Sequence, residues 1–195
     1  GEKTTVSDFG AWMWRRLRQS LVQNLGNDFI ACQKPIRRIQ FSDRYCNSPL
    51  TVALLHNMLR QLQESYGDSW TAPTCMIFLA NNFTGDSTTI WSNWRSAEAR
   101  NEAVKILLQG IGKILVIPSS KTDLPHARSL CLDFLDGTQL QIWLDQGLGF
   151  LKVSHSNREL QFPFYEKCEE QVRVLRTMGQ TLEVVPGGTV ISMRH

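Results

Sequence analysis

The sequence lacks several patterns that would place it in a class at once. No apolar run approaches the roughly 18 residues that a membrane-spanning helix needs, and the chain does not open on a signal-peptide pattern. The five cysteines are odd in number, scattered and without a CxxC pair, and the four histidines lie far apart. These absences argue against a transmembrane protein, a disulfide framework and a zinc site. They predict a reducing, cytoplasmic setting, with no metal and no cofactor.

The chain also has little excess of one charge over the other. The 195 residues carry a net charge of +3, which permits nucleic acid or anionic lipid as a partner without demanding either. A composition of 42% apolar and 20% charged residues is ordinary for a globular protein. The length fits a single domain, which we expect over 1–195, with a core at 36–155, an N-terminal helix at 7–25, and a C-terminal helix and strands at 163–193. The leading glycine suggests that the natural polypeptide is longer.

Hydrophobic periodicity predicts a helix followed by strand–helix units in the first half of the chain. Apolar residues recur every fourth position over 7–25, and the arginines at 15, 16 and 18 form either a solvated face or a phosphate-contacting patch. Short apolar runs predict buried parallel strands, and the segments between them have a helical spacing of apolar residues. The expected strands are 36–42, 75–80 and 113–117, the last closed by Pro118. One expected helix begins at Ser48-Pro49 in a region that Gly67 ends, and another runs over 96–109.

The pattern changes in the second half. Three strands follow in a row at 127–135, 139–144 and 149–153, which predicts an antiparallel meander. A last helix is expected at 164–178, and short strands at 182–185 and 189–192. The predicted fold is therefore α/β, a mixed sheet flanked by helices with a parallel first half and an antiparallel second half.

One stretch, from Leu124 to Gly137, combines a strand with reactive side chains. Residues two apart on a strand share a face, so His126 and Arg128 are expected to project together. An imidazole beside a fixed cation suits a phosphate group, because the His can attack or move a proton while the Arg binds the phosphate oxygens. The alternative is a half-buried strand with a His and an Arg at its solvated end.

A second polar group lies between the first predicted strand and the helix that follows it. Open α/β sheets place their ligands between the carboxyl end of a strand and the amino end of the next helix, although such a segment is often only a turn. The predicted phosphate-binding residues are Asp43, Arg44, Tyr45, Lys121 and Arg128.

The stretch around His126 resembles the signature of the phospholipase D superfamily, which is His-x-Lys, four residues, then Asp. His126-Ala127-Arg128, with Asp133 after four residues, has this spacing, with Arg in place of Lys. The likeness is closest to the phospholipase D-like domain at the C-terminus of MIT-domain proteins. That domain also has an Asp-x-Tyr turn, as at 43–45, and a Gly-rich aromatic stretch, as at 145–150. The likeness covers about residues 36–155.

The resemblance implies a catalytic set, which this chain carries only in part. In active members two motifs meet, so His126 would be nucleophile or acid, Arg128 the clamp on developing charge, and Asp133 a supporting group. This chain has a single motif, so catalysis would require a homodimer, and the Gly-Ser-x-Asn segment after the motif is absent. Arg does not reproduce the geometry of Lys at a tight phosphate site. These departures favour a degenerate site that binds a phosphate without cleaving it.

The leading prediction is a domain that recognises a phosphodiester backbone, with nucleic acid preferred over anionic lipid. Arginines accompany Trp91 and Trp94, a mixture that suits single-stranded nucleic acid, although packing is the alternative role for these tryptophans. The resemblance also suggests protein partners in a larger bacterial DNA-processing or defence assembly. One competing prediction is a dimeric, metal-independent phosphodiesterase or nuclease that uses His126. Others are a phosphoinositide- or membrane-binding domain, and a protein-interaction domain in which His126 is merely a packed residue.

Overall fold

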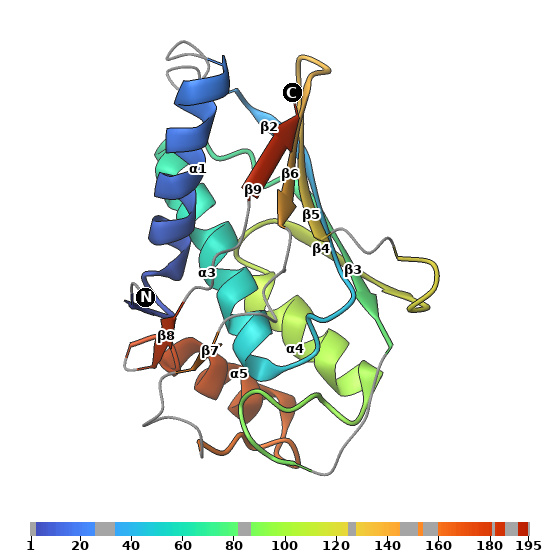
Figure 1. Ribbon diagram of the computed structural model, residues 1–195. Helices are drawn as coiled ribbons and strands as arrows, with labels where there is room; N and C mark the ends of the chain where they lie inside the picture. Colours follow the sequence, from blue (N-terminus) through green and yellow to red (C-terminus); the bar gives the residue numbers. More distant parts are fainter. Residues whose placement is uncertain are drawn as a thin grey trace.

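The computed structural model describes residues 3–25, 34–81, 87–124, 128–144, 152–153, 160–180, 182–185 and 191–194. Four α-helices in this part of the chain lie on one side of a six-stranded sheet (Figure 1). None of these helices combines the length and the apolar character that crossing a bilayer requires. The helices are α1 (Phe9–Leu25), α3 (Pro49–Tyr66), α4 (Ala97–Leu108) and α5 (Cys168–Thr177).

The main sheet has the strand order β4-β3-β2-β5-β6-β9. The neighbours β4, β3 and β2 are parallel, and every pairing from β2 through β5 and β6 to β9 is antiparallel. This confirms the α/β prediction of a mixed sheet with a parallel first half and an antiparallel second half. The strands are β2 (Ile36–Asp43), β3 (Thr74–Ala80), β4 (Lys113–Ser119), β5 (Arg128–Phe134), β6 (Gln139–Leu144) and β9 (Ile191–Arg194).

The predicted three-stranded meander is wrong in its third member. Strands β5 and β6 form the expected hairpin across Asp136-Gly137, where Gly137 takes a positive φ of 85°. The described part of the third segment, β7 (Lys152–Val153), instead joins a small sheet of order β1-β8-β7, with β1 at Thr4–Thr5 and β8 at Glu183–Val185. Strand β9, with four paired residues, takes the position beside β6 that the predicted meander gave to the third strand.

Among the predicted boundaries that differ from the structure are the end of β4 and the beginning of α5. Strand β4 does not close before Pro118 but continues through it to Ser119, because β4 is an edge strand and can tolerate a residue without an N–H. Helix α5 begins at Cys168 and not at Phe164. The carbonyl oxygens of Phe164 and Glu166 accept hydrogen bonds from the amide of Gln171, at 3.1 and 3.0 Å, so these residues form a turn below the helix.

Helix α3 begins and ends where the sequence predicts. Ser48 caps it by accepting a hydrogen bond from the Thr51 N–H, and the Thr51 hydroxyl accepts one from the Ser48 N–H in return. Pro49 occupies the first turn, where its missing N–H costs nothing. Gly67 ends the helix with a positive φ of 54°. The cap therefore fixes the turn that joins β2 to α3.

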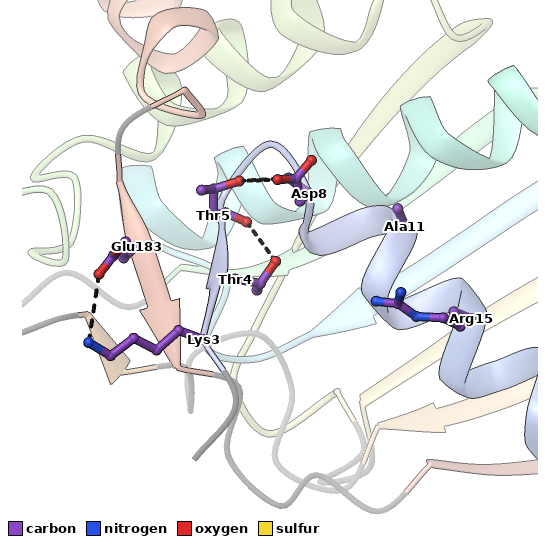
Figure 2. Close-up of a pocket in the computed structure, with 7 residues that line it drawn as sticks. All are labelled: Lys3, Thr4, Thr5, Asp8, Ala11, Arg15 and Glu183. Carbon is purple, nitrogen blue, oxygen red and sulfur yellow. Dashed lines mark hydrogen bonds and ion pairs between the residues drawn. The ribbon is translucent and has the colours of Figure 1, made fainter.

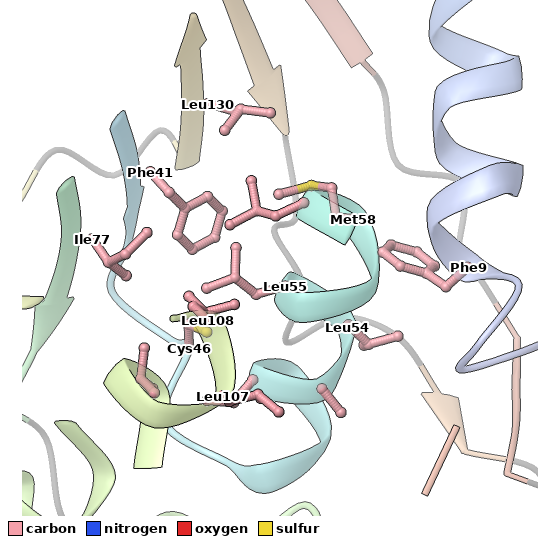
Figure 3. Close-up of a cluster of buried hydrophobic side chains, with 14 of the residues drawn as sticks. Phe9, Phe41, Cys46, Leu54, Leu55, Met58, Ile77, Leu107, Leu108 and Leu130 are labelled. Atoms are coloured by element: carbon pink, nitrogen blue, oxygen red, sulfur yellow. The ribbon is translucent and has the colours of Figure 1, made fainter. Parts of the chain in front are cut away.

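The core lies between the sheet and the helix layer. Phe41 of β2 and Ile77 of β3 meet Leu55 of α3 and Leu108 of α4, and all four side chains are fully buried (Figure 3). Helix α1 packs closely on α3, since a Cβ placed at Gly10 would come within 2.3 Å of the Asn57 carbonyl oxygen. This close packing holds the carboxyl ends of β2 and β3 in a defined position.

His56 makes the stability of this layer depend on pH. Burial and the charges of Arg60 and Arg176 lower the pKa of this α3 side chain from 6.5 to about 4. The unfolded chain therefore binds a proton at His56 before the folded protein does. As pH falls from 6.5 to 4, this residue alone should lower the free energy of unfolding by at most about 1.4 kcal/mol per pH unit.

The measurement is urea unfolding of the wild type and of His56→Gln between pH 7.5 and 4.5. The difference in the free energy of unfolding between the two proteins should shift in favour of the variant as the pH falls. A difference that stays constant across this range would contradict the low pKa of His56.

Candidate functional site

An ion pair joins the carboxyl end of β2 to the amino end of β5. The antiparallel register pairs Ser42 with Ser129, which places Asp43 and Arg128 at the adjoining positions. The Asp43 Oδ1 lies 3.8 Å from the Arg128 Nε, and the two side chains are 0% and 16% exposed. A pair so far removed from water fixes the end of one strand against the beginning of the other.

Tyr45 is the aromatic centre of the same region. The Asp43 Oδ1 accepts a hydrogen bond of 2.7 Å from the Tyr45 N–H, which holds the backbone in a tight turn. The guanidinium carbon of Arg128 lies 4.7 Å from the centre of the tyrosine ring, and the ammonium nitrogen of Lys121 lies 5.6 Å from it. Tyr45 as a whole residue is nonetheless 37% exposed. It therefore presents an aromatic surface with two cations next to it.

Arg44 brings a third cation to this region. Its Nε donates a hydrogen bond of 2.6 Å to the Leu124 carbonyl oxygen, so the β2–α3 turn is tied to the segment that leads into β5. Lys121 belongs to that segment and is exposed. We call Asp43, Arg44, Tyr45, Lys121 and Arg128 the Tyr45 cluster. These five residues are the predicted phosphate-binding set. The structure places two of their three cations, Lys121 and Arg128, over the Tyr45 ring, pairs Arg128 with the buried Asp43, and ties Arg44 to the Leu124 carbonyl oxygen.

The position of the Tyr45 cluster in the sheet is also suited to a ligand. From β2 the chain passes through α3 to β3 on one side, whereas β5 pairs with β2 on the other side. The strand order therefore reverses at β2. In open α/β sheets, ligands bind outside the carboxyl ends of the strands at such a reversal.

Asp133 lies away from this cluster. It is five residues beyond Arg128, or about 17 Å along an extended strand. Burial raises its pKa, but hydrogen bonds that it accepts from Arg38, Gln40 and Gln139 outweigh burial and leave the pKa below its usual value. The structure thus separates Asp133 from Arg128. His126 lies outside the described residues, as does the Gly-rich stretch at 145–150.

The two tryptophans of the sequence analysis differ in environment. Trp94 is 1% exposed, packs edge-on against Phe162 and Phe164, and donates a 2.9 Å hydrogen bond from Nε1 to the Gln171 Oε1. It belongs to the core, as the packing alternative proposed. Trp91 is 37% exposed. The arginines at 15, 16 and 18 are exposed on α1.

Sequence reasoning missed a buried cation below the Tyr45 cluster. Arg100 of α4 has no exposed surface, and it donates hydrogen bonds to the Ala80 carbonyl oxygen at 2.7 Å and to the side-chain oxygen of Asn47. Burial lowers the pKa of its guanidinium to about 10, so it remains charged at neutral pH. A signal was present in the sequence, because Arg100 stands in the apolar stripe that α4 continues at 103, 104, 107 and 108.

A separate hollow of 460 Å³ lies between β1, α1 and β8 (Figure 2). Most of its charged groups already have partners within the hollow. Lys3 lies 3.9 Å from Glu183, and the carboxylate of Asp8 accepts a hydrogen bond of 2.8 Å from the Thr5 hydroxyl. Arg15 is the one member that the sequence analysis had named. Mixed charge and exposed walls do not select a class of ligand here.

The described residues offer charge for binding but little for catalysis. Cys46, three positions after Asp43, is fully buried, and burial together with the charge of Asp43 raises the pKa of its thiol well above the usual range. No group of three His, Cys, Asp or Glu side chains that could hold a metal occurs in the described ranges. The charges of the Tyr45 cluster suit the recognition of an anion.

Comparison with known proteins gave one family. The family model described as the C-terminal domain of the DEAD/DEAH box helicase YjiV matches residues 3–193. Neither the curated proteins nor the solved structures yielded a match. The description of the matched family names a helicase and does not mention the phospholipase D superfamily. Because the match spans nearly the whole sequence, the chain belongs to the family of C-terminal domains of the DEAD/DEAH box helicase YjiV.

Proposed function

We propose that this domain binds the phosphodiester backbone of single-stranded nucleic acid through the Tyr45 cluster, as an accessory module of a helicase, and does not cleave it. The observation that carries the proposal is that Lys121 and Arg128 lie over the ring of Tyr45, while Arg44 of the same turn is tied to the segment that carries Lys121. Cations neutralise phosphates, and an exposed aromatic ring offers a surface on which a base can stack. The combination fits a strand whose bases are unpaired.

Two further points support this ligand. The family description names a helicase, a class of protein that works on nucleic acid, and this favours nucleic acid over an anionic lipid. The resemblance of His126-x-Arg128 to the phospholipase D signature points to a phosphate-bearing ligand at the same end of β5. Arg128 is also part of the Tyr45 cluster, so both arguments meet at one residue.

Binding without cleavage is favoured by the departures from the phospholipase D pattern. The chain has one motif, and Arg128 stands where the signature has Lys. Asp133 is engaged by Arg38, Gln40 and Gln139 at the far end of β5. A dimeric phosphodiesterase built on His126 is the competing hypothesis, and it predicts cleavage that survives a chelator and disappears in His126→Ala.

The wider setting is part of the same proposal. We propose that residues 1–195 form one domain of a longer polypeptide, with the other parts of the helicase and further proteins as partners. The scattered cysteines fit a reducing, cytoplasmic compartment, and those that the structure describes are free thiols. A bacterial DNA-processing or defence assembly fits a helicase of this kind.

Lys121→Ala provides the direct test of the Tyr45 cluster. The affinity for a fluorescently labelled single-stranded DNA is measured by anisotropy over a series of salt concentrations. Lys121 is exposed, so its loss should leave folding intact. If Lys121 contacts one phosphate, the variant binds more weakly and the slope of log K against log salt becomes shallower by about 0.7.

Lys105→Ala is the matched control, because Lys105 is also exposed but lies on α4. It should leave both the affinity and the salt slope unchanged. Equal behaviour of the two variants would contradict a role for the Tyr45 cluster. Binding to phosphatidylserine vesicles in preference to DNA would identify a lipid ligand instead, and His126-dependent cleavage of the DNA would establish the enzyme.

A further inference from the structure

The fully buried guanidinium of Arg100 donates hydrogen bonds to several elements next to the Tyr45 cluster. It donates to the Ala80 carbonyl oxygen at the end of β3, to Asn81 at 3.3 Å, to Asn101 at 3.0 Å, and to the Asn47 Oδ1 in the β2–α3 turn. A guanidinium can serve these partners at once because its donors form a rigid fork. Arg100 therefore joins the first turn of α4 to the ends of both β2 and β3.

Asn47 passes this connection on to the backbone of the Tyr45 cluster. Its side-chain oxygen accepts from Arg100, while its Nδ2 donates to the Arg44 carbonyl oxygen at 3.2 Å. Its backbone N–H donates to the Tyr45 carbonyl oxygen at 3.0 Å, and its own carbonyl accepts from the Trp94 N–H at 3.1 Å. Asn47 is 2% exposed, so water has little access to these bonds. Its amide orientation is set by Arg100, which binds its oxygen and thereby aims its nitrogen at Arg44.

We propose that Arg100 is a positioning residue for nucleic-acid binding, acting through Asn47 on the backbone of Arg44 and Tyr45. This inference rests on the proposed function of the Tyr45 cluster. Arg44 and Tyr45 lie in a turn and not within a strand, so their side chains are only as well placed as the carbonyl groups that hold the turn. Binding sites need such support because small displacements of the contacting groups lower affinity.

The test uses two variants that change no charge. Arg100→Lys keeps the cation but loses the fork, and Asn47→Ala removes the relay. Each should lower the affinity for single-stranded DNA about tenfold, the lower end of what losing an orienting partner costs at other sites. The salt slope should stay at the wild-type value, because the number of neutralised phosphates does not change. The double variant should bind no more weakly than Asn47→Ala alone.

Leu175→Ala is the control for general destabilisation, since this α5 side chain is 1% exposed and not part of the Tyr45 cluster. All affinities are measured at a temperature at which urea unfolding shows each variant to be folded. Affinity losses in Arg100→Lys and Asn47→Ala no greater than that in Leu175→Ala, or additive losses in the double variant, would overturn the positioning role. If Arg100→Lys does not fold, Asn47→Ala alone decides between these results.

The positioning role and the proposed function fail in different ways. If Lys121→Ala leaves DNA binding unchanged, the Tyr45 cluster is not the binding site and the proposed function is lost. If Lys121→Ala weakens binding but Asn47→Ala does not, the Tyr45 cluster binds nucleic acid without help from Arg100. In that case the proposed function stands and the positioning role is rejected.

Discussion

Replacing Trp94 with alanine should lower the free energy of unfolding by about 3–5 kcal/mol, as expected for a large aromatic side chain in a core. Trp94 lies with its ring centre 5.4 Å from that of Phe162 and 5.8 Å from that of Phe164, both edge-on. Its Nε1 also donates to Gln171, so the substitution leaves a buried amide oxygen without this donor. Urea unfolding followed by circular dichroism measures the loss.

Trp91→Ala is the matched control, because it removes the same side chain three positions earlier in the sequence. Trp91 is 37% exposed, so its removal should cost clearly less than that of Trp94. Two equal losses would contradict the assignment of Trp94 to the core. If Trp91→Ala also weakens DNA binding while the protein stays folded, the single-strand contact predicted for this residue would be supported.

The parts of the fold that depend on local pattern could be predicted from the sequence. Helix α3 was predicted at both ends, because Ser48, Pro49 and Gly67 act on the backbone beside them. The parallel strands followed from short apolar runs. The place of β7 could not be predicted, since it depends on the competition of β9 for the edge of β6, and β9 lies about fifty residues from that edge in the sequence.

The same distinction holds for the candidate site. Asp43, Arg44 and Tyr45 could be named because they follow a strand and precede a helix, and that position is a property of the local sequence. The pairing of Asp43 with Arg128 depends on the β2–β5 register, which no local pattern specifies. The resemblance to the phospholipase D signature also implied that Asp133 supports the motif. The extended strand instead carries Asp133 away from Arg128 to partners on its neighbours.

The β2–β5 register makes the Asp43 carboxylate compete with a bound phosphate for Arg128. Asp43 neutralises part of the charge that Arg128 could otherwise offer to a phosphate. It also holds the Tyr45 N–H, so it stabilises the turn while it weakens the positive field. Stability and affinity are therefore expected to respond in opposite directions when the carboxylate is removed.

Asp43→Asn should lower the free energy of unfolding by about 3–5 kcal/mol, because it removes the fully buried carboxylate that faces the largely buried guanidinium of Arg128. The amide oxygen can still accept from the Tyr45 N–H, so the turn is retained. Where the variant is folded, its affinity for single-stranded DNA should rise, since Arg128 no longer faces a negative charge. Urea unfolding and anisotropy measure the two effects.

The double variant Asp43→Asn/Arg128→Met separates the ion pair from the rest of the packing. With both charges gone, no largely buried guanidinium has lost the Asp43 carboxylate, so this protein should be more stable than Asp43→Asn alone. Its DNA affinity should fall below that of the wild type, because one of the three cations of the Tyr45 cluster is missing. The single variant Arg128→Met completes the cycle. Strictly additive losses of stability over the two single variants would show that Asp43 and Arg128 do not interact, and unchanged DNA affinity in Arg128→Met would remove Arg128 from the binding site.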